Sequence, residues 1–414
     1  MNNYPFPTRG AAEFLSLPVC SENTECEIVA PLSAGEEASS VRGVLHKPGA
    51  QPTKVREACL DDYEDIARLV ARYKLDARSF EEWSHLWRNN PVYQGREWWP
   101  IGWVLENREK EIVGHIGNIP LLYELQGRTL LAATGRAFVV DAKYRSHSFL
   151  LLDRYFRQPA VDLHLNTSVN SQAVGAYRTF RASQVPVGAW DRSSFWITNC
   201  RGFVESLLRS KSVPLATALS LPLALLPRLH DLFTSKKLQF ERTGEVNSCS
   251  DFDERFDAFW DALKNTTSRL VAVRDRATLN WHFKYSLLRK RVWILTVGTV
   301  SRIDAYAIFF RDDNCQFKLK RMRLIDFQAL ECKYSLLLPI MQEALQRCRA
   351  EGIDMLEVLG YCPEKRKVID DFIPYNRQIP AWMYFYRTKN RDLAEVLNRP
   401  EVWDPTGFDG DSSF

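Results

Sequence analysis

The first half of the chain begins with a short strand and a helix, according to its pattern of hydrophobic and polar positions. Segment 54–60 alternates as a strand does, and segment 61–73 carries Ile66, Leu69 and Val70 at helical spacing. These three residues form one apolar stripe, as on a helix that packs against a sheet. Structure is therefore expected to begin near residue 54.

A second helix and a group of strands follow. Ser79 and Glu82 are spaced as a capping box, which predicts a helix over 79–90. The period then changes to that of strands separated by turn residues. Three antiparallel strands are predicted, over 99–106, 111–127 and 129–141. A helix, a buried strand and a further helix complete this half, over 148–158, 161–169 and 170–182.

The second half repeats this order without strong sequence identity. An amphipathic helix is expected over 252–265. The later elements are predicted as three strands, a helix, a strand and a helix, over 291–300, 304–313, 317–327, 335–352, 353–361 and 362–373. Such repetition indicates two structural units of the same kind.

The length of 414 residues agrees with two domains, because one core rarely supports so long a chain. The Ser-, Gly- and Glu-rich start is expected to be a mobile arm, and the acidic, turn-rich segment 403–414 a solvated tail. The predicted units are an arm, a first domain, a connecting segment, a second domain and a C-terminal tail, over 1–52, 53–200, 201–250, 251–390 and 391–414.

Charge and cysteine content exclude several classes of function. The net charge of +4 is too small to indicate a nucleic-acid partner, so no DNA binding is expected. The nine cysteines have no regular spacing, which argues against zinc sites and disulfides, and no metal is expected. The N-terminus lacks the pattern of a signal peptide. A cytoplasmic location, with membrane association as an option, is the expectation.

The order of elements in the first half resembles the GNAT superfamily of N-acyltransferases. In that family, the loop after the fourth strand and the next helix N-terminus hold the pyrophosphate of acyl-CoA. Segment 139–156 is similar to the family's loop motif, with Arg145 in its first place. Ser148 and Leu150 replace the two glycines of the motif. The resemblance implies CoA contacts from Arg145, Ser146, His147, Ser148 and Phe149.

A second signature of the family is better kept. Asn170, Ala173 and Tyr177 reproduce its N-x-x-A-x-x-x-Y pattern, and helical spacing places them on one face of a helix. The resemblance implies that Asn170 and Ala173 border the acyl-CoA, and that Tyr177 protonates the departing thiolate as a general acid.

N-acylation also requires a base for the amine and a donor for the thioester oxygen. His115 and Glu124, on the same predicted strand, are the candidate bases. A backbone amide at Val139 or Val140 is the candidate oxyanion donor. The resemblance thus implies acyl transfer, with acetyl as the expected group, from acyl-CoA to an amine such as an amino sugar or surface-polymer precursor.

The second half fits a degenerate GNAT-like partner domain. Segment 274–283 is similar to one found in tandem GNAT proteins of bacterial polysaccharide gene clusters. The expected fold is therefore α/β, of the α+β kind, with two tandem domains that each contain a mixed, largely antiparallel sheet flanked by helices. Tyr361, Glu357 and Trp281 are candidates to line the acceptor cleft.

Two alternatives stay open. One is a binding protein that kept the fold without catalysis. The other is a transferase that uses aminoacyl-tRNA between paired GNAT domains, with a basic groove formed by Lys318, Lys320, Arg321 and Arg323.

The apolar segment 213–227 lies between the halves and has basic flanks at Arg209, Lys211 and Arg228. It is too short to span a bilayer as a helix, for which roughly 20 residues are needed. It is expected to plug the space between domains, or to lie in a membrane interface and bring the enzyme to a lipid-linked substrate.

Overall fold

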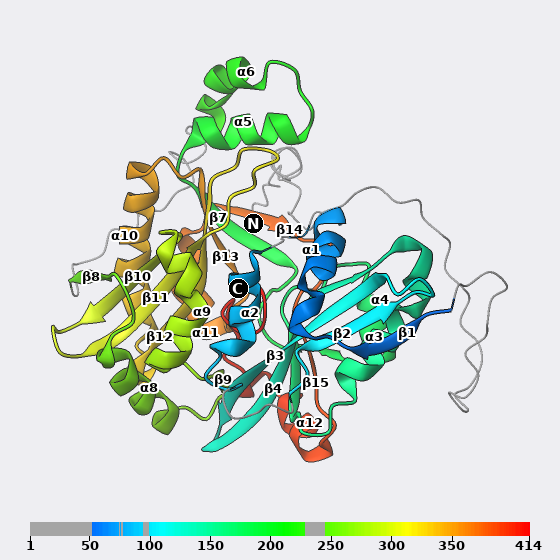
Figure 1. The fold of residues 1–414 in the computed structure, drawn as a ribbon. Coiled ribbons are helices and arrows are strands. Elements are labelled where there is room, and N and C mark those ends of the chain that lie inside the picture. Colours follow the sequence, from blue (N-terminus) through cyan, green and yellow to red (C-terminus); the bar gives the residue numbers. More distant parts are fainter. Residues whose placement is uncertain (1–51, 74, 76–77, 94–98, 228–244) are drawn as a thin grey trace, which may run out of the picture.

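The computed structural model describes residues 52–73, 75, 78–93, 99–227 and 245–414, which form two sheets flanked by helices (Figure 1). This confirms the predicted fold class. Of the arm expected over 1–52, all but Pro52 lies outside the described residues.

The first sheet has eight strands and is mostly antiparallel. In spatial order they are β1 (Lys54–Glu57), β2 (Gly102–Glu106), β3 (Ile112–Leu125), β4 (Arg128–Val140), β5 (Leu163–Asn166), β15 (Phe385–Arg387) and β6 (Ser183–Gln184), with β9 (Val271–Ala272) paired to β3. Only β4 and β5 run parallel in this sheet. The three central predicted strands are therefore confirmed as β2, β3 and β4.

The long hairpin of β3 and β4 turns on two residues. Gln126 and Gly127 both have positive φ, of 52° and 77°, as a type I′ turn requires. This turn matches the right-handed twist of the flanking strands, so Leu125 pairs directly with Arg128. The end of the hairpin reaches the second half of the chain, where Tyr123 pairs with Ala272.

The second sheet has seven strands with the same parallel step near its middle. Their spatial order is β14 (Tyr375–Gln378), β7 (Arg192–Ile197), β13 (Met355–Leu359), β12 (Arg321–Ala329), β11 (Ile303–Arg311), β10 (Val292–Gly298) and β8 (Val246–Cys249). Strand β7 comes from the first half of the chain, whereas β15 of the first sheet comes from near the end. Each sheet thus contains a strand from the other half.

The seven predicted helices form, and two that were not predicted, over 276–288 and 391–397, join them in the second half; four of these nine have a side-chain cap. Those of the first half are α1 (Tyr63–Arg72), α2 (Phe80–Arg88), α3 (Ser148–Phe156) and α4 (Val174–Thr179). Those of the second half are α8 (Glu254–Thr266), α9 (Arg276–Leu288), α10 (Leu337–Ala350), α11 (Pro363–Ile369) and α12 (Arg391–Leu397). The predicted cap of α2 is confirmed, since the Ser79 hydroxyl accepts a bond from the Glu82 amide at 3.3 Å.

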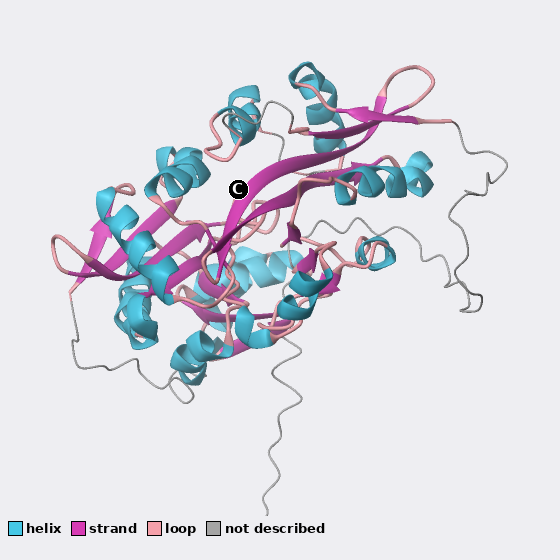
Figure 2. Ribbon diagram, turned by 90° about the horizontal axis from the view of Figure 1, so that it is seen from below, coloured by secondary structure: helices cyan, strands magenta, loops and turns pink. Residues whose placement is uncertain are grey.

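The segment after α12 is buried, so the expectation of a solvated tail is wrong. Trp403, Thr406 and Ser413 are each 1% exposed or less. The C-terminus lies in the middle of the molecule in both views (Figures 1 and 2). Its acidic residues are tolerated there because buried cations pair with them, as shown below for Asp404 and Asp409.

The middle apolar segment does not plug the space between domains. It forms α6 (Ala216–Leu223), which follows α5 (Cys200–Ser210), and the two helices project from the second sheet (Figure 1). Phe203 and Leu207 of α5 pack against that sheet. Helix α6 packs on α5 and faces away from the body of the molecule.

Candidate functional site

The first sheet opens at the junction of β4 and β5. Their parallel pairing joins Ala132–Thr134 to Leu163–Leu165 and then stops, although β4 continues to Val140. A strand edge without a neighbouring strand leaves backbone groups that must bond elsewhere. This junction is therefore the place in the first domain where backbone and ligand can meet.

Asn166 bridges the two strands where their pairing ends. With its amide oriented to satisfy every neighbour, its Oδ1 accepts from Gly135 N–H at 3.1 Å and from the Tyr177 hydroxyl at 3.2 Å. Its Nδ2 donates to the Tyr155 oxygen at 3.2 Å, and the Tyr155 hydroxyl donates to Ala133 O at 3.0 Å. The junction is thus held by a neutral, fully bonded network.

The structure places Tyr177 at this junction. Its side chain is 4% exposed, and burial raises the pKa of the hydroxyl well above its ordinary value, with a further contribution from Asp411. The hydroxyl therefore stays protonated at neutral pH and is a donor. Tyr177 also packs edge-on against Phe156 of α3, at a centroid distance of 5.7 Å.

The helix that carries Tyr177 is shorter than predicted. Helix α4 begins at Val174, so Asn170 precedes it and Ala173 is its N-cap residue. Asn170 Oδ1 accepts from the Ala173 amide at 3.0 Å, which shapes the turn before the helix. The asparagine thus positions the start of α4 and, unlike Tyr177, is exposed.

Strand β4 has a bulge close to the junction. His115 pairs with Val139 and Gly117 with Arg136, so two residues of β4, Ala137 and Phe138, face one residue of β3. Ala137 has a φ of 50°, a left-handed value that marks the bulged position. The bulge turns the end of β4 relative to the rest of the sheet.

The two predicted oxyanion donors point to opposite edges of β4. Asp141 N–H donates to Val113 O at 2.8 Å, and the antiparallel pattern alternates from there. Val139 therefore bonds to His115 on β3, while the Val140 amide points to the edge that faces β5. Of the two, Val140 is the one whose amide points to the β5 edge, although it lies five residues beyond Gly135.

His115 lines a pocket on the other side of the bulge. The pocket lies between α1, α2 and the β3–β4 bulge. Its lining is mainly apolar and aromatic with a few polar groups: Tyr63, Ile66, Ala67, Val70, Arg78, Trp83, Leu86, Trp87, His115, Gly117, Arg136 and Ala137. Such a lining is typical of small-molecule sites.

The imidazole of His115 is neutral in this pocket. Burial lowers its pKa to about 4, and Nδ1 lies 3.2 Å from Ala137 O. Because a carbonyl only accepts, Nδ1 carries the proton, which leaves Nε2 as an acceptor. The structure thus gives His115 the form a base requires.

Glu124, the other candidate base, lies far from His115 on the same strand. Nine residues separate the two on β3, a distance of about 30 Å at ordinary strand rise. The Glu124 carboxylate accepts a bond from Thr129 at 2.5 Å, near the hairpin turn. The structure does not bring the two candidates together.

The loop after β4 folds as a short 3₁₀ helix, Ala142–His147, that leads directly into α3. Its amides are used internally: the Ser148 N–H donates to Arg145 O. His147 Nδ1 lies 2.7 Å from the Thr53 hydroxyl oxygen. Arg145, Ser146 and Phe149 are exposed beside it. Without the glycines, this loop offers side chains to a phosphate instead of the backbone cradle of the family.

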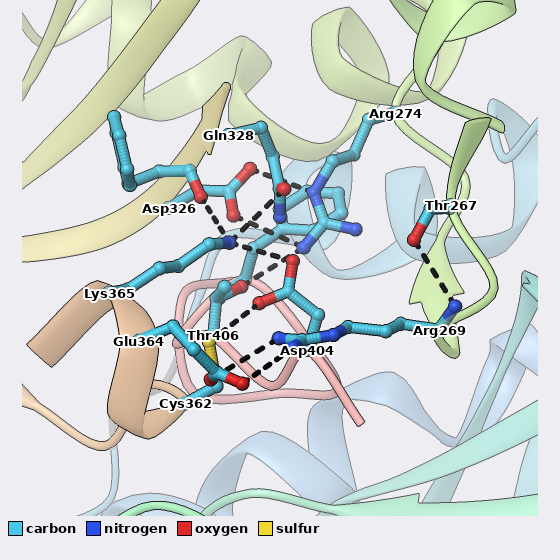
Figure 3. A network of polar contacts seen from close by, with 12 residues as sticks. Thr267, Arg269, Arg274, Asp326, Gln328, Cys362, Glu364, Lys365, Asp404 and Thr406 are labelled. Atoms are coloured by element: carbon cyan, nitrogen blue, oxygen red, sulfur yellow. Dashed lines mark hydrogen bonds and ion pairs between the residues drawn. The ribbon is translucent and has the colours of Figure 1, made fainter. Parts of the chain in front are cut away.

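The second sheet has an equivalent junction between β12 and β13, but a buried lysine fills it (Figure 3). Lys365 Nζ donates to Phe327 O at 2.8 Å, to Gln328 Oε1 at 3.2 Å and to Asp404 Oδ2 at 2.7 Å. The lysine is 1% exposed. Its ammonium group is enclosed by these three oxygen acceptors.

A second buried ion pair adjoins Lys365. Arg274 donates to both oxygens of Asp326, at 2.9 and 3.1 Å, and lies 3.5 Å from Asp409. Burial acts to raise the pKa of Asp326, but the charge of Arg274 outweighs it and lowers the pKa below its ordinary value. These charges connect the segment after α12 to the second sheet.

The basic groove expected for an RNA substrate is largely neutralised. Arg321 and Arg323 are 8% and 14% exposed at the side chain, and both pair with Asp312 and Glu357. Burial acts to raise the pKa of Glu357, but nearby arginines lower it well below its usual range. Lys318 and Lys320 are exposed.

The other residues expected to line an acceptor cleft pack inside the fold. The Tyr361 hydroxyl donates to Leu324 O at 3.2 Å, Glu357 is enclosed by arginines, and Trp281 stacks near His85. None of the three lines either described pocket.

Sequence reasoning missed several residues of the candidate site. Asn166 follows the apolar run of β5, and a polar amide at a strand end was the available signal. Trp83 and Trp87, four residues apart on α2, and Arg136 on β4 lie on elements that were predicted correctly, whereas Arg78 precedes the N-cap of α2. Their convergence depends on how α2 packs on the sheet.

Two tandem domains of the GNAT fold, each with a parallel step between its fourth and fifth strand equivalents, are the class that the architecture defines. No family model and no curated protein matches the chain. Solved structures match it at low identity.

An N-myristoyltransferase of Saccharomyces cerevisiae, with bound myristoyl-CoA and inhibitors, has a TM-score of 0.53 at 13% identity, covering 89% of this chain and 88% of that one. Another structure of the yeast enzyme, with bound myristoyl-CoA, has a TM-score of 0.51 at 12% identity and covers 94% of each chain. A GCN5-related N-acetyltransferase from Anabaena variabilis has a TM-score of 0.50 at 11% identity, covering 82% of this chain and 73% of that one. These similarities show the fold.

Within the described ranges, no three His, Cys, Asp or Glu side chains are grouped so as to hold a metal ion. No helix of the described part of the chain has the length and apolar character needed to cross a membrane.

Proposed function

We propose that this chain is an acyltransferase of the GNAT type, which transfers an acyl group from acyl-CoA to an amine. The observation that carries the proposal is the position of the Tyr177 hydroxyl, which is protonated and held by Asn166 where β4 and β5 part. A proton donor fixed at an open strand junction suits the departure of a thiolate.

In this proposal the thioester lies along the open edge of β4. The amine nitrogen attacks the thioester carbon, and a tetrahedral intermediate forms. A backbone amide on the β4 edge that faces β5, close to Gly135 where Tyr177 is held, donates to the oxygen as negative charge develops. Val140 is not this donor, because it lies five residues beyond Gly135, roughly 15 Å along the strand. When the carbon–sulfur bond breaks, Tyr177 supplies the proton to sulfur.

The amine approaches from the pocket between α1 and α2. His115 Nε2 is its base, because the imidazole is neutral and lines this pocket. Glu124 is too far along β3 to share this role. With a pKa of about 4, His115 is a weak base but is unprotonated throughout the neutral range.

The CoA phosphates are placed at the 3₁₀ helix after β4. Arg145 is exposed there, and Ser148 opens α3, whose N-terminus favours an anion. The acyl group is acetyl in the simplest form of the proposal, and the acceptor is an amino sugar or surface-polymer precursor. Because the similar yeast N-myristoyltransferase structures hold myristoyl-CoA, the test includes a long acyl chain.

The alternatives predict different ligands. A non-catalytic protein would bind no acyl-CoA, since the loop lacks its glycines. An aminoacyl-tRNA-dependent transferase would need cations free for RNA, whereas Arg321 and Arg323 are already paired with carboxylates. The acyl-CoA proposal requires no such groove.

Titration calorimetry with CoA, acetyl-CoA and myristoyl-CoA is the first experiment. We expect binding of at least one of them; no binding at millimolar ligand would overturn the proposal. Acyl transfer to amino sugars is then compared between wild type and Tyr177→Phe, for which kcat is expected to fall by about 10²-fold.

Tyr386→Phe is the matched control. Tyr386 is 4% exposed and lies in β15 of the same sheet, but its hydroxyl bonds to Leu397 O and Asn398. Its kcat should equal that of the wild type. An equal loss in both variants would mean that buried hydroxyls stabilise the fold and that Tyr177 has no chemical role.

A further inference from the structure

Helix α6 has two apolar faces, and only one of them packs against the protein. Ala216, Ser220 and Ala224 are buried toward α5, with exposed fractions of 6% or less. On the other side and just beyond the helix, large side chains face solvent: Leu215, Leu219, Leu221, Leu225 and Leu226, at 79%, 42%, 62%, 55% and 61%. We call these five residues the leucine face.

This clustering is unusual for a surface. Five of the ten exposed large hydrophobic residues among the described ones fall within 215–226. Single exposed leucines need no explanation, whereas a contiguous patch marks an interaction site. Leu215 also has a φ of 57°, a left-handed value that leucine rarely adopts.

The polar groups near the leucine face are already bonded. The Thr217 hydroxyl, the one polar side chain on the exposed part of α6, donates to Glu205 at 2.9 Å and accepts from Arg209 at 3.0 Å. A protein interface of stable size forms about ten hydrogen bonds, and its core is rich in aromatic residues. The leucine face provides neither, but a hydrocarbon layer requires neither.

The charge around the leucine face is cationic. Residues 212–227 contain no charged side chain. Within α5 and the turn, Arg201, Arg209 and Lys211 oppose only Glu205, a net charge of +2, and Arg209 pairs with Glu205 at 2.6 Å. Arg201 and Lys211 are exposed. Arg228, the other expected basic flank, lies outside the described residues.

We propose that α5 and α6 form a membrane-contact surface: the leucine face enters the interfacial layer of a bilayer, and Arg201 and Lys211 contact anionic headgroups. Helix α6 has eight residues and contains Pro222, so it lies in the interface and does not span it. This proposal does not depend on acyl transfer.

Flotation with lipid vesicles tests the proposal. The full chain should float with vesicles of phosphatidylcholine and phosphatidylglycerol, and less with phosphatidylcholine alone. Leu215→Gln/Leu219→Gln/Leu226→Gln should partition at least about tenfold more weakly, because binding scales with the apolar area buried. Arg201→Glu/Lys211→Glu should abolish the preference for the anionic vesicles.

Leu288→Gln/Val300→Gln is the matched control, since these residues are 71% and 95% exposed elsewhere on the second domain. It should float as the wild type does. No flotation of the wild type, or an equal loss in the control, would overturn the proposal. The proposal would also be overturned if the wild type were a dimer in solution, if the leucine variant were a monomer, and if vesicles did not dissociate the wild-type dimer. Thermal melting of each variant verifies folding, because exposed leucines add little to the core.

Discussion

In each domain one parallel pair of strands separates, β4 from β5 in the first and β12 from β13 in the second. The side chains at the two junctions differ in charge. In the first, Asn166 and two tyrosines make a neutral network between β4 and β5. In the second, Lys365 and Asp404 place an ion pair between β12 and β13. A neutral network leaves the outer part of β4 open, whereas a buried ammonium must stay where its partners are. One fold, used twice, thus has two junctions of different charge, and the proposed ligand would lie at the neutral one.

The largest expected effect comes from removing the lysine. Lys365→Met leaves Asp404 buried without its counter-charge, and should lower the free energy of unfolding by about 3–5 kcal/mol. Urea unfolding followed by tryptophan fluorescence measures it. Adding Asp404→Asn should recover most of the loss, since no charge is then left unpaired.

Lys367→Met is the control for this variant. Lys367 is exposed on the same helix, so its replacement should change stability by less than about 0.5 kcal/mol. If Lys365→Met were equally mild, the gap in the second domain would not depend on the ion pair, and the contrast between the domains would fail.

The second effect concerns Asp409, in the segment after α12, and is seen in how protein stability depends on pH. Burial raises the pKa of Asp409 to about 7, only partly offset by Arg274. As pH rises above about 4, Asp409 loses its proton in the unfolded chain but keeps it in the folded chain until about pH 7. The free energy of unfolding of the wild type therefore falls between these two pH values. Asp409→Asn has no such proton. Its stability relative to wild type should grow by about 3 kcal/mol between pH 5 and pH 8.

Thermal or urea unfolding of both proteins across this range measures the difference. The buried histidines titrate in both, so the difference reports on position 409 alone. If the stability difference between Asp409→Asn and wild type did not change with pH, Asp409 would be ionised in the folded protein at all these pH values. The charge of Arg274 would then outweigh the effect of burial on the pKa of Asp409.

The sequence predicted the fold better than it predicted the partners of its strands. The order of helices and strands in each half follows from apolar periodicity, which the structure keeps. The exchange of β7 and β15 was not visible, because strands of six and three residues carry little pattern and their pairing is set by tertiary contacts.

The segment after α12 shows that the polarity of a sequence segment is also a limited guide to its burial. Its aspartates indicated a solvated tail, yet Asp404 and Asp409 meet Lys365 and Arg274, which lie 39 and 135 residues away in the chain. Only the folded arrangement brings such charges together. Likewise, Tyr177 was found through its motif, whereas Asn166, which holds its hydroxyl, belongs to no motif of the sequence.

A smaller effect is expected at the neutral junction. Asn166→Ala leaves the Gly135 amide and the hydroxyl of Tyr177 without their partner. The cost should be about 1–2 kcal/mol, less than for Lys365, because the lost groups are uncharged. Hydrogen exchange at the Gly135 amide should accelerate. Unchanged exchange would mean that Asn166 does not bridge the strands.

The smallest effect compares the loops that follow β4 and β12. Arg145 is exposed after β4, and Lys333 is exposed after β12, paired with Glu331 at 2.8 Å. If only the first domain binds acyl-CoA, Arg145→Ala should weaken CoA binding by about fivefold to tenfold, near 1 kcal/mol, and more so at low salt. Lys333→Ala should leave it unchanged. Titration calorimetry with CoA on both variants measures the difference. Weaker binding by Lys333→Ala would indicate that CoA binds at the second junction, and Lys365 would then have to move.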